Sequence, residues 1–327
     1  MVNISNANTE AYYRFIKFHE DLNDIIKVNT ASIQTFKRIT SVINGSELIG
    51  SLIDSCEKPW KKNAKYPTFD RIIDNSINNN SNLYLVYVLT GFDWFTFNLI
   101  KDINLFSNSL RPHIHNIQHI DFLNISNINF DESSNCCYKE ATKFTKRYTL
   151  KPRINKIKTI LSINNTEFDK YATIFNFIRA IRNCIAHSNS YPSEELLQIY
   201  GNSRYQQLLI SDHLMQKYLP AVSKNLQIVL KEEHALYSSN ICLKLAKIIN
   251  EEAIKSFDLY SVIKQIFYYK LYLGLNIEGN AKYRDFYNLI LQCLHSRYKV
   301  KGVDRNCLVN LIKKGPDYIT IKNMFKP

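Results

Sequence analysis

The sequence predicts an all-α protein, because two observations agree along the chain. Apolar residues recur at three- and four-residue spacing, which is the period of one helix face. Runs in which apolar and polar residues alternate, as they do in half-buried strands, are not found in the sequence. The chain is therefore expected to be built from helices throughout.

The N-terminal part of the chain predicts two helices and a boundary. Apolar residues repeat at helical spacing from Tyr12 to Ile26 and again over residues 33–43, and Gly45 offers a stop. His19 falls on the apolar face of the first of these helices, so it is expected to be a core histidine. The serine- and asparagine-rich segment 76–81 marks a plausible first boundary.

The middle of the chain predicts a buried helix and a basic region. From Asn82 to Leu105 the sequence is apolar nearly all round, which is typical of a central helix in a bundle. A basic helix is expected over residues 137–149, and Pro152 separates it from another helix at about 153–163.

The next helix has signals at both ends. Asn164-Asn165-Thr166-Glu167 supplies a cap and an acidic first turn, and apolar spacing continues to about His187. Residues 188–192, which end in Pro192, stop this helix, and Ser193-Glu194-Glu195 caps its successor. Helical periodicity continues beyond residue 200. We therefore expect three regions: an N-terminal helical region (1–80), a central domain (81–205) and a C-terminal helical region (206–327).

Composition excludes several classes of protein. The chain has 8 glycines in 327 residues, and their spacing allows neither a GxGxxG fingerprint nor a phosphate-binding P-loop. The longest apolar run, Leu83 to Phe92, is too short to cross a bilayer, and the polar N-terminus lacks the layout of a secretory signal. Seven scattered cysteines are typical of reduced thiols. These features indicate a cytoplasmic protein that does not insert into a membrane.

The positive charge is concentrated in two places. The net charge is +13, and residues 201–327 carry 19 Lys and Arg against 10 Asp and Glu. A second cluster is opposed only by Glu140. Its members are Lys139, Lys143, Lys146, Arg147, Lys151, Arg153, Lys156 and Lys158. Such surfaces favour a polyanion, most commonly nucleic acid, although a solvated helix face explains the charge equally well.

A polar stripe interrupts the apolar helix that ends near His187. Arg179, Asn183 and His187 are four residues apart and so share one face, and Arg182 can reach the same cleft. Burial of these groups among Ile and Phe side chains is unfavourable unless each finds a partner. Polar residues in this pattern are where a functional site is expected.

Arg182, Asn183 and His187 form an Arg-Asn-x-x-x-His motif on the last turns of a long apolar helix, which resembles the signature of the HEPN superfamily. The likeness covers residues 166–190 and extends less specifically over the helices from Asn82 to Tyr200. It implies an up-and-down helical bundle and a metal-independent endoribonuclease that acts as a homodimer. It also implies a bacterial toxin or anti-phage (abortive infection) effector with an antitoxin or regulatory partner, and Asp93 is the candidate for the family's further acidic residue.

The same residues suit RNA cleavage on chemical grounds. Attack by the 2′-hydroxyl needs a proton acceptor and donor, which histidine provides near neutral pH, so His187 fits this role. Arg182 fits the stabilisation of phosphorane charge, and Asn183 would hold the imidazole or the phosphate. One chain supplies a single such histidine, so a two-fold dimer would provide the pair. Arg179 would support the site, and basic residues 139–158 would hold the RNA backbone.

Two other interpretations remain open for the motif. The residues could form a satisfied polar network in a non-catalytic module that binds RNA or nucleotides or that dimerises. Alternatively, the basic C-terminal third could bind nucleic acid while the motif is structural. The sequence indicates no cofactor.

A histidine cluster raises the question of a metal. His113, His115 and His119 lie within seven residues, and Cys136 and Cys137 follow along the chain. No Glu follows His115 as a HExxH protease requires, and no CxxC accompanies the cluster, so we expect surface or packing histidines and no metal site.

Overall fold

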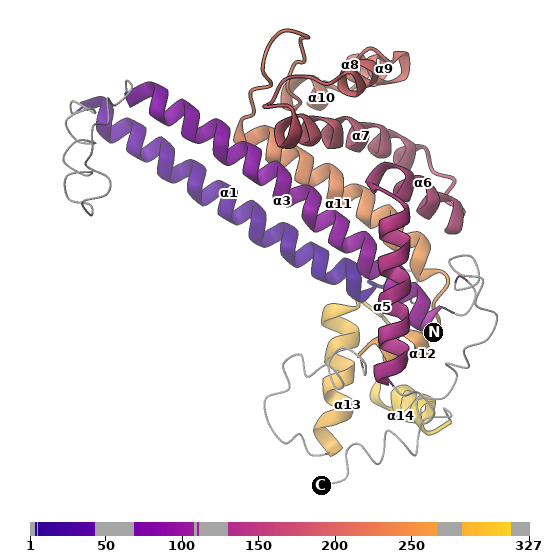
Figure 1. The fold of residues 1–327 in the computed structure, drawn as a ribbon. Coiled ribbons are helices and arrows are strands. Elements are labelled where there is room, and N and C mark those ends of the chain that lie inside the picture. Colours follow the sequence, from indigo (N-terminus) through magenta and orange to yellow (C-terminus); the bar gives the residue numbers. More distant parts are fainter. Residues whose placement is uncertain are drawn as a thin grey trace. The chain divides into compact units, whose positions relative to one another are not determined.

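The all-α prediction is confirmed for the residues that the structure describes. The computed structural model describes residues 4, 6–42, 69–107, 110, 130–266 and 283–314, and every regular element within them is a helix (Figure 1). The elements are α1 (Glu10–Val42), α3 (Phe69–Phe106), α5 (Phe130–Arg147), α6 (Leu150–Ile160), α7 (Thr166–His187), α8 (Glu194–Tyr200), α9 (Ser203–Ser211), α10 (His213–Tyr218), α11 (Glu232–Ile254), α12 (Leu259–Ile266), α13 (Tyr283–Gln292), the π-helical turn η4 (Cys293–Arg297) and α14 (Arg305–Lys314).

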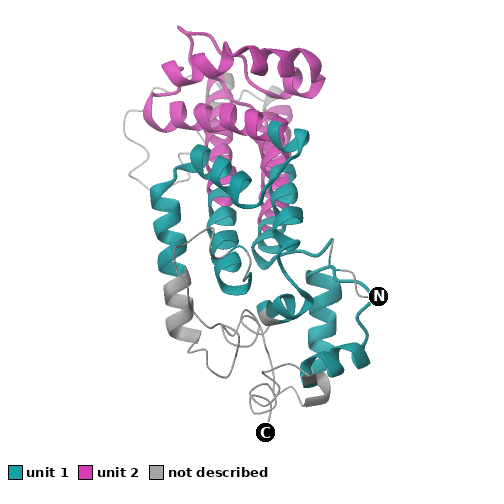
Figure 2. Cartoon of the chain, turned by 90° about the vertical axis from the view of Figure 1, so that its right-hand side faces the viewer, with its two compact units in different colours: residues 1–17, 92–169, 244–327 teal, residues 18–91, 170–243 magenta. Residues whose placement is uncertain are grey.

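The chain divides into two compact units, each assembled from separate segments (Figure 2). Unit 1 comprises residues 1–17, 92–169 and 244–327, and unit 2 comprises residues 18–91 and 170–243. These units do not coincide with the three consecutive regions expected from the sequence. The reason is that the boundaries fall inside long helices, so that α1, α3, α7 and α11 each contribute to both units.

Two predicted interruptions near the N-terminus are wrong. The two helices expected between residues 9 and 43 form the single helix α1, and the expected boundary at residues 76–81 lies inside α3. One asparagine of this segment stabilises unit 2, because Asn78 Oδ1 accepts a hydrogen bond from the backbone N–H of Leu230 at 3.0 Å. A polar segment can therefore remain helical when its side chains meet partners from another part of the chain.

Helix α3 contains the predicted central helix and extends it. Among the described residues it is the one helix, from Ile73 to Phe106, that is long and apolar enough to cross a membrane, but 61% of its most apolar window is buried inside the chain. The core helix of a globular domain can be equally long and apolar. The apolar character of α3 is therefore explained by burial, with Phe92, Phe95 and Leu99 fully inaccessible to solvent.

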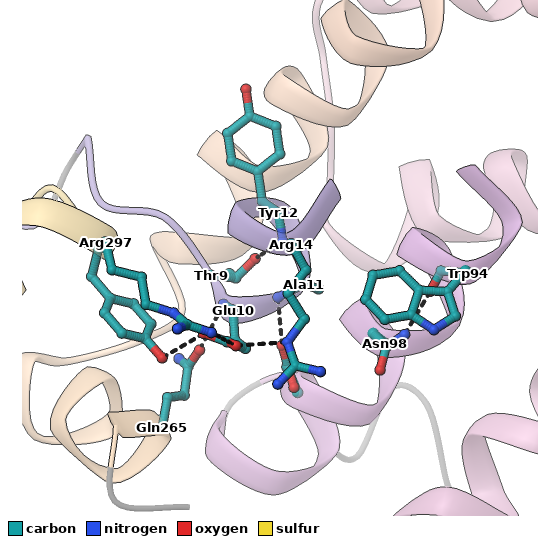
Figure 3. A network of polar contacts seen from close by, with 11 residues as sticks. Thr9, Glu10, Ala11, Tyr12, Arg14, Trp94, Asn98, Gln265 and Arg297 are labelled. Atoms are coloured by element: carbon teal, nitrogen blue, oxygen red, sulfur yellow. Dashed lines mark hydrogen bonds and ion pairs between the residues drawn. The ribbon is translucent and has the colours of Figure 1, made fainter. Parts of the chain in front are cut away.

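In unit 1, the first turn of α1 is buried, and three of its leading N–H groups are satisfied by side chains from distant segments, while the N–H of Tyr12 donates locally to Thr9 Oγ1 at 3.2 Å (Figure 3). The N–H of Thr9 donates to Asn250 Oδ1 at 2.8 Å, and that of Glu10 donates to Gln265 Oε1 at 3.1 Å. The N–H of Ala11 donates to Asp102 Oδ2 at 3.1 Å. Because these groups have no partner within the helix, their capping ties three other helices to the start of α1.

The Glu10 carboxylate is the charged centre of this network. Its side chain is 1% exposed and accepts hydrogen bonds from the guanidinium groups of Arg14 and Arg297 and, at 2.8 Å, from the Tyr298 hydroxyl. The Arg297 guanidinium also lies over the Tyr13 ring. Burial raises the pKa of Glu10, but hydrogen bonds and charge from Arg297, with Arg14 adding to them, outweigh burial and leave the pKa lowered.

In unit 2, α1 and α3 approach closely at a glycine. A Cβ atom added to Gly91 would lie 2.0 Å from Cε1 of the Phe18 ring, so the ring occupies the space above the α3 backbone. The residue after Phe18, His19, is 7% exposed and confirmed as a core histidine. Its Nδ1 lies 2.7 Å from Ser239 Oγ and its Nε2 accepts from Asn23 at 3.0 Å, and burial lowers its pKa.

The helices before the candidate site lie near the predicted segments, but α5 begins at Phe130, seven residues before the expected start at 137. The basic helix is α5, and the break falls at Tyr148 and Thr149 rather than at Pro152. Pro152 lies in the first turn of α6, where the missing N–H would have no helical partner in any case.

We predict that Glu10→Gln destabilises the protein by about 3 kcal/mol at neutral pH, because it leaves the Arg297 guanidinium without its carboxylate in a buried position. The lowered pKa means that the Glu10 carboxylate stabilises the fold above its unfolded value of 4.5, and that this contribution is lost as pH falls through the folded pKa. Urea unfolding followed by circular dichroism, between pH 7 and pH 3, would measure both effects. A variant with the wild-type stability and pH profile would contradict this account.

We predict that Gly91→Ala destabilises the protein by about 1–3 kcal/mol, because the added methyl group collides with the Phe18 ring. The double variant Gly91→Ala/Phe18→Leu should lose less free energy of unfolding than the two single variants lose together, because the shorter side chain at position 18 relieves the collision. Gly201→Ala is the matched control: its nearest neighbour would be Leu197 O at an ordinary 3.4 Å, and its backbone is helical. Thermal unfolding of the four variants would measure the coupling.

Candidate active site

Helix α7 carries the candidate site and begins and ends at the predicted residues, Thr166 and His187. The side chain of Asn165 accepts hydrogen bonds from the N–H groups of Glu167 at 2.8 Å and Phe168 at 3.2 Å, which confirms the predicted cap. Phe175, Phe177 and Ile178 are almost fully buried along the same helix. The cap and the buried face hold α7 in place, and its last turns present the polar motif.

The motif residues grade from half-buried to exposed towards the end of α7. Arg182 and Asn183 are half-buried, and His187, one turn further, is exposed. Arg182 Nη1 donates to Asn183 Oδ1 at 3.3 Å. The arrangement presents an imidazole to solvent beside a guanidinium and an amide that are already oriented towards each other.

Arg182 has an unusual environment for a cation. Its Nε is buried and has no hydrogen-bond partner within the described part of the chain. A buried N–H without a partner is unfavourable, so such groups are uncommon unless a ligand or water completes them. The Nε of Arg182 is therefore an unsatisfied buried donor near the end of the helix, where His187 is exposed.

Arg179 lies on the same stripe but its guanidinium is engaged within unit 2. Its Nη2 forms an ion pair with Glu195 of α8, and Nη2 and Nε donate to Asn176 at 3.1 and 3.2 Å. The side chain is 13% exposed. Arg179 therefore joins α8 to α7. It would support the candidate site indirectly, by holding these two helices together.

The turn that follows His187 is held by several hydrogen bonds. The N–H groups of Ser188 and Ser190 both donate to the Cys184 carbonyl, at 2.9 and 3.1 Å, and Asn189 and Ser190 have positive φ angles of 48° and 65°. The backbone N–H of Ser193 donates to Cys184 Sγ at 3.3 Å, and Ser193 caps α8 as predicted. The sequence marked this segment only as a helix stop; the structure shows that it is a fixed connection.

In unit 1, most of the predicted RNA-binding side chains are exposed on α5 and α6. They are Lys139, Lys143, Lys146, Arg147 and Lys151. Lys143 forms an ion pair with Glu140 at 2.5 Å, and the Arg147 guanidinium lies over the Tyr148 ring. Contact with a phosphate backbone is therefore sterically open to these five residues.

Arg153 is a correction to the predicted RNA-binding set. It is 4% exposed, and its guanidinium donates to the carbonyls of Thr145 and Tyr148 at 3.0 and 3.1 Å and forms an ion pair with Asp93. A side chain whose donors are used inside the unit cannot contact RNA. Asp93, the candidate acidic residue, is thus engaged by Arg153; its predicted supporting role at the site remains a prediction.

The histidine cluster at residues 113–119 lies outside the described residues, as do the side chains of Cys136 and Cys137. Among the residues that are described, no group of three or more His, Cys, Asp or Glu side chains could hold a metal ion.

Comparisons with protein-family models, with curated proteins and with solved structures find no match to this chain. The function of the α7 tip is therefore inferred from its residues and geometry and from the motif resemblance.

We predict that Arg153→Met lowers the free energy of unfolding by about 2 kcal/mol, because it removes charge-assisted hydrogen bonds that are shielded from water. Lys151→Met, two residues away and exposed, should change stability by no more than about 0.5 kcal/mol. Equilibrium urea unfolding of both variants measures the difference. Equal effects would show that the buried contacts of Arg153 do not stabilise unit 1.

Proposed function

We propose that this protein is a metal-independent endoribonuclease of the HEPN type, which cleaves RNA through its own 2′-hydroxyl group at a site shared by two copies of the chain. One observation carries the proposal: His187 is exposed at the tip of α7, one turn from Arg182 and Asn183, on a helix whose other face is buried and apolar. Had this tip been sealed in the interior, substrate could not have reached it.

His187 supplies the acid–base chemistry in this proposal. One imidazole accepts the proton of the 2′-hydroxyl as that oxygen attacks phosphorus. The bond from phosphorus to the 5′-oxygen breaks, and a protonated imidazole gives its proton to the departing oxygen. The products are a 2′,3′-cyclic phosphate and a 5′-hydroxyl, so the reaction requires RNA rather than DNA.

Arg182 and Asn183 act on the phosphate. A guanidinium remains protonated and can donate to two phosphate oxygens, which suits it to the charge of the transition state. The Nε of Arg182 is buried, so phosphate would be contacted by the terminal Nη groups of this half-buried side chain. Asn183 accepts from Arg182 through Oδ1, so its amide N–H₂ would be the group that donates to the imidazole or the phosphate.

A homodimer completes the site because acid and base must act in the same reaction. A two-fold axis at the tip of α7 would bring the partner's His187 to the opposite side of the phosphate. The exposed basic residues of α5 and α6 would bind the RNA backbone, so affinity should fall as salt rises. A cytoplasmic toxin or anti-phage effector, restrained by an antitoxin or another regulator, is the setting that the resemblance implies.

We predict that purified protein cleaves single-stranded RNA in the presence of EDTA and that His187→Ala lowers the rate at least about a hundredfold, because the acid–base group is removed. Arg182→Ala should lower it to a similar extent. His213→Ala is the matched control, since His213 is an exposed histidine at the start of α10. Gel analysis of 5′-labelled RNA, with the product termini identified by mass spectrometry, measures the reaction.

Three results would contradict the proposal. If His213→Ala lowered the cleavage rate as much as His187→Ala does, the effect would be a general one on folding. Cleavage of an all-deoxy oligonucleotide would exclude attack by the 2′-hydroxyl. RNA binding without cleavage, retained in His187→Ala and Arg182→Ala, would instead indicate a binding module. Growth arrest on expression, relieved by Arg182→Ala, would support the toxin setting.

A further inference from the structure

The residue that follows the turn at the tip of α7 is an exposed aromatic. Tyr191 is 47% exposed, and its backbone N–H donates to the carbonyl of Ser188 at 2.9 Å. Ser188 directly follows His187, so one hydrogen bond links the backbone of Tyr191 to the neighbour of the candidate catalytic residue. In the described part of the chain, neither a hydrogen bond nor a ring contact engages the phenol side chain.

The position of Tyr191 is restricted on both sides. Before it, the carbonyl of Asn189 accepts from the Gln227 side chain at 3.1 Å, and that of Ser190 accepts from the Ile228 N–H at 2.8 Å. After it comes Pro192, which limits the backbone of the preceding residue to extended conformations. The ring is therefore presented from a fixed backbone, and little ordering is needed when a planar ligand stacks on it.

The segment bonded to this turn adds apolar surface. Leu226 is 66% exposed and Val229 is 60% exposed, on either side of the two residues that bond to Asn189 and Ser190. The polar motif and an exposed aromatic with apolar neighbours thus share one end of α7. A nucleotide has a corresponding division, with a charged phosphate and a flat base whose π face can stack on an aromatic ring.

We propose that Tyr191 is a substrate-positioning residue that stacks on the nucleobase next to the scissile phosphate, so that the protein prefers unpaired RNA over a duplex. This inference rests on the function proposed above. Stacking on an aromatic ring requires an unstacked, accessible base, as found in single-stranded loops and ends. The tyrosine would contribute binding and orientation while His187 and Arg182 perform the chemistry.

The test compares Tyr191→Ala with Tyr191→Phe, which keeps the ring. Tyr87→Ala is the matched control, because Tyr87 is also an exposed tyrosine of unit 2, on α3. Cleavage of a single-stranded RNA and of the same sequence in a duplex gives KM and kcat for each variant. We expect Tyr191→Ala to raise KM for the single strand on the order of tenfold, Tyr191→Phe to change it less than about twofold, and the preference over the duplex to shrink.

A binding experiment separates this inference from the proposed reaction. In the His187→Ala background, fluorescence anisotropy with a labelled single-stranded RNA should show affinity on the order of tenfold weaker when Tyr191→Ala is added. Tyrosine-dependent binding by a wild-type protein that cuts no RNA would overturn the nuclease and leave the stacking role standing. Tyr191→Ala that matches Tyr87→Ala in both assays would overturn the stacking role alone.

Tyr191 could instead belong to the contact between two copies of the chain. Light scattering after size exclusion distinguishes this case. We expect Tyr191→Ala to have the same mass in solution as the wild type. A change to a smaller species, with binding restored by higher protein concentration, would assign the residue to the dimer contact and overturn its role in base stacking.

Discussion

A polar group that is withdrawn from water must find a hydrogen-bond partner, and this constraint organises both units of the protein. In unit 1, Glu10 is buried with Arg297 from the far end of the chain, and the N–H groups of the first turn of α1 meet side chains of α3, α11 and α12. Arg153 meets the same requirement with Asp93 and two backbone carbonyls. In each case a single buried side chain fixes several helices, which explains how segments so distant in sequence form one compact unit.

The candidate active site departs from this pattern, because one of its buried polar groups has no partner among the described residues. Arg179 is satisfied by Glu195 and Asn176 and joins α8 to α7. Arg182, on the adjacent turn, keeps a buried Nε without a partner in the described residues, and His187 is open to solvent. Two arginines three residues apart thus differ: one joins two helices through an ion pair, and the other is the residue proposed to contact phosphate.

Local signals along the chain predicted the site-bearing helix well. The limits of α7, its cap by Asn165, the cap of α8 by Ser193 and the burial of His19 were all readable from residue type and spacing. Prediction was poorer where a long-range partner overrides the local signal. Residues 76–81 carry the composition of a loop, yet they are helical within α3, where Asn78 bonds to Leu230. Arg153 has the sequence neighbourhood of a surface cation but is buried, because Asp93 lies within reach in the folded chain.

Residue types and their spacing were sufficient to predict that the described residues are helical, where α7 begins and ends, and that Arg182, Asn183 and His187 share one end of that helix, because caps and spacing act over a few residues. Long-range contacts in the folded chain decide which cations are engaged inside the protein and which reach solvent. They also decide that separated segments combine into two units and that the turn carrying Tyr191 is anchored to residues 227 and 228. These outcomes depend on contacts between residues far apart in the chain, for which local patterns carry no signal.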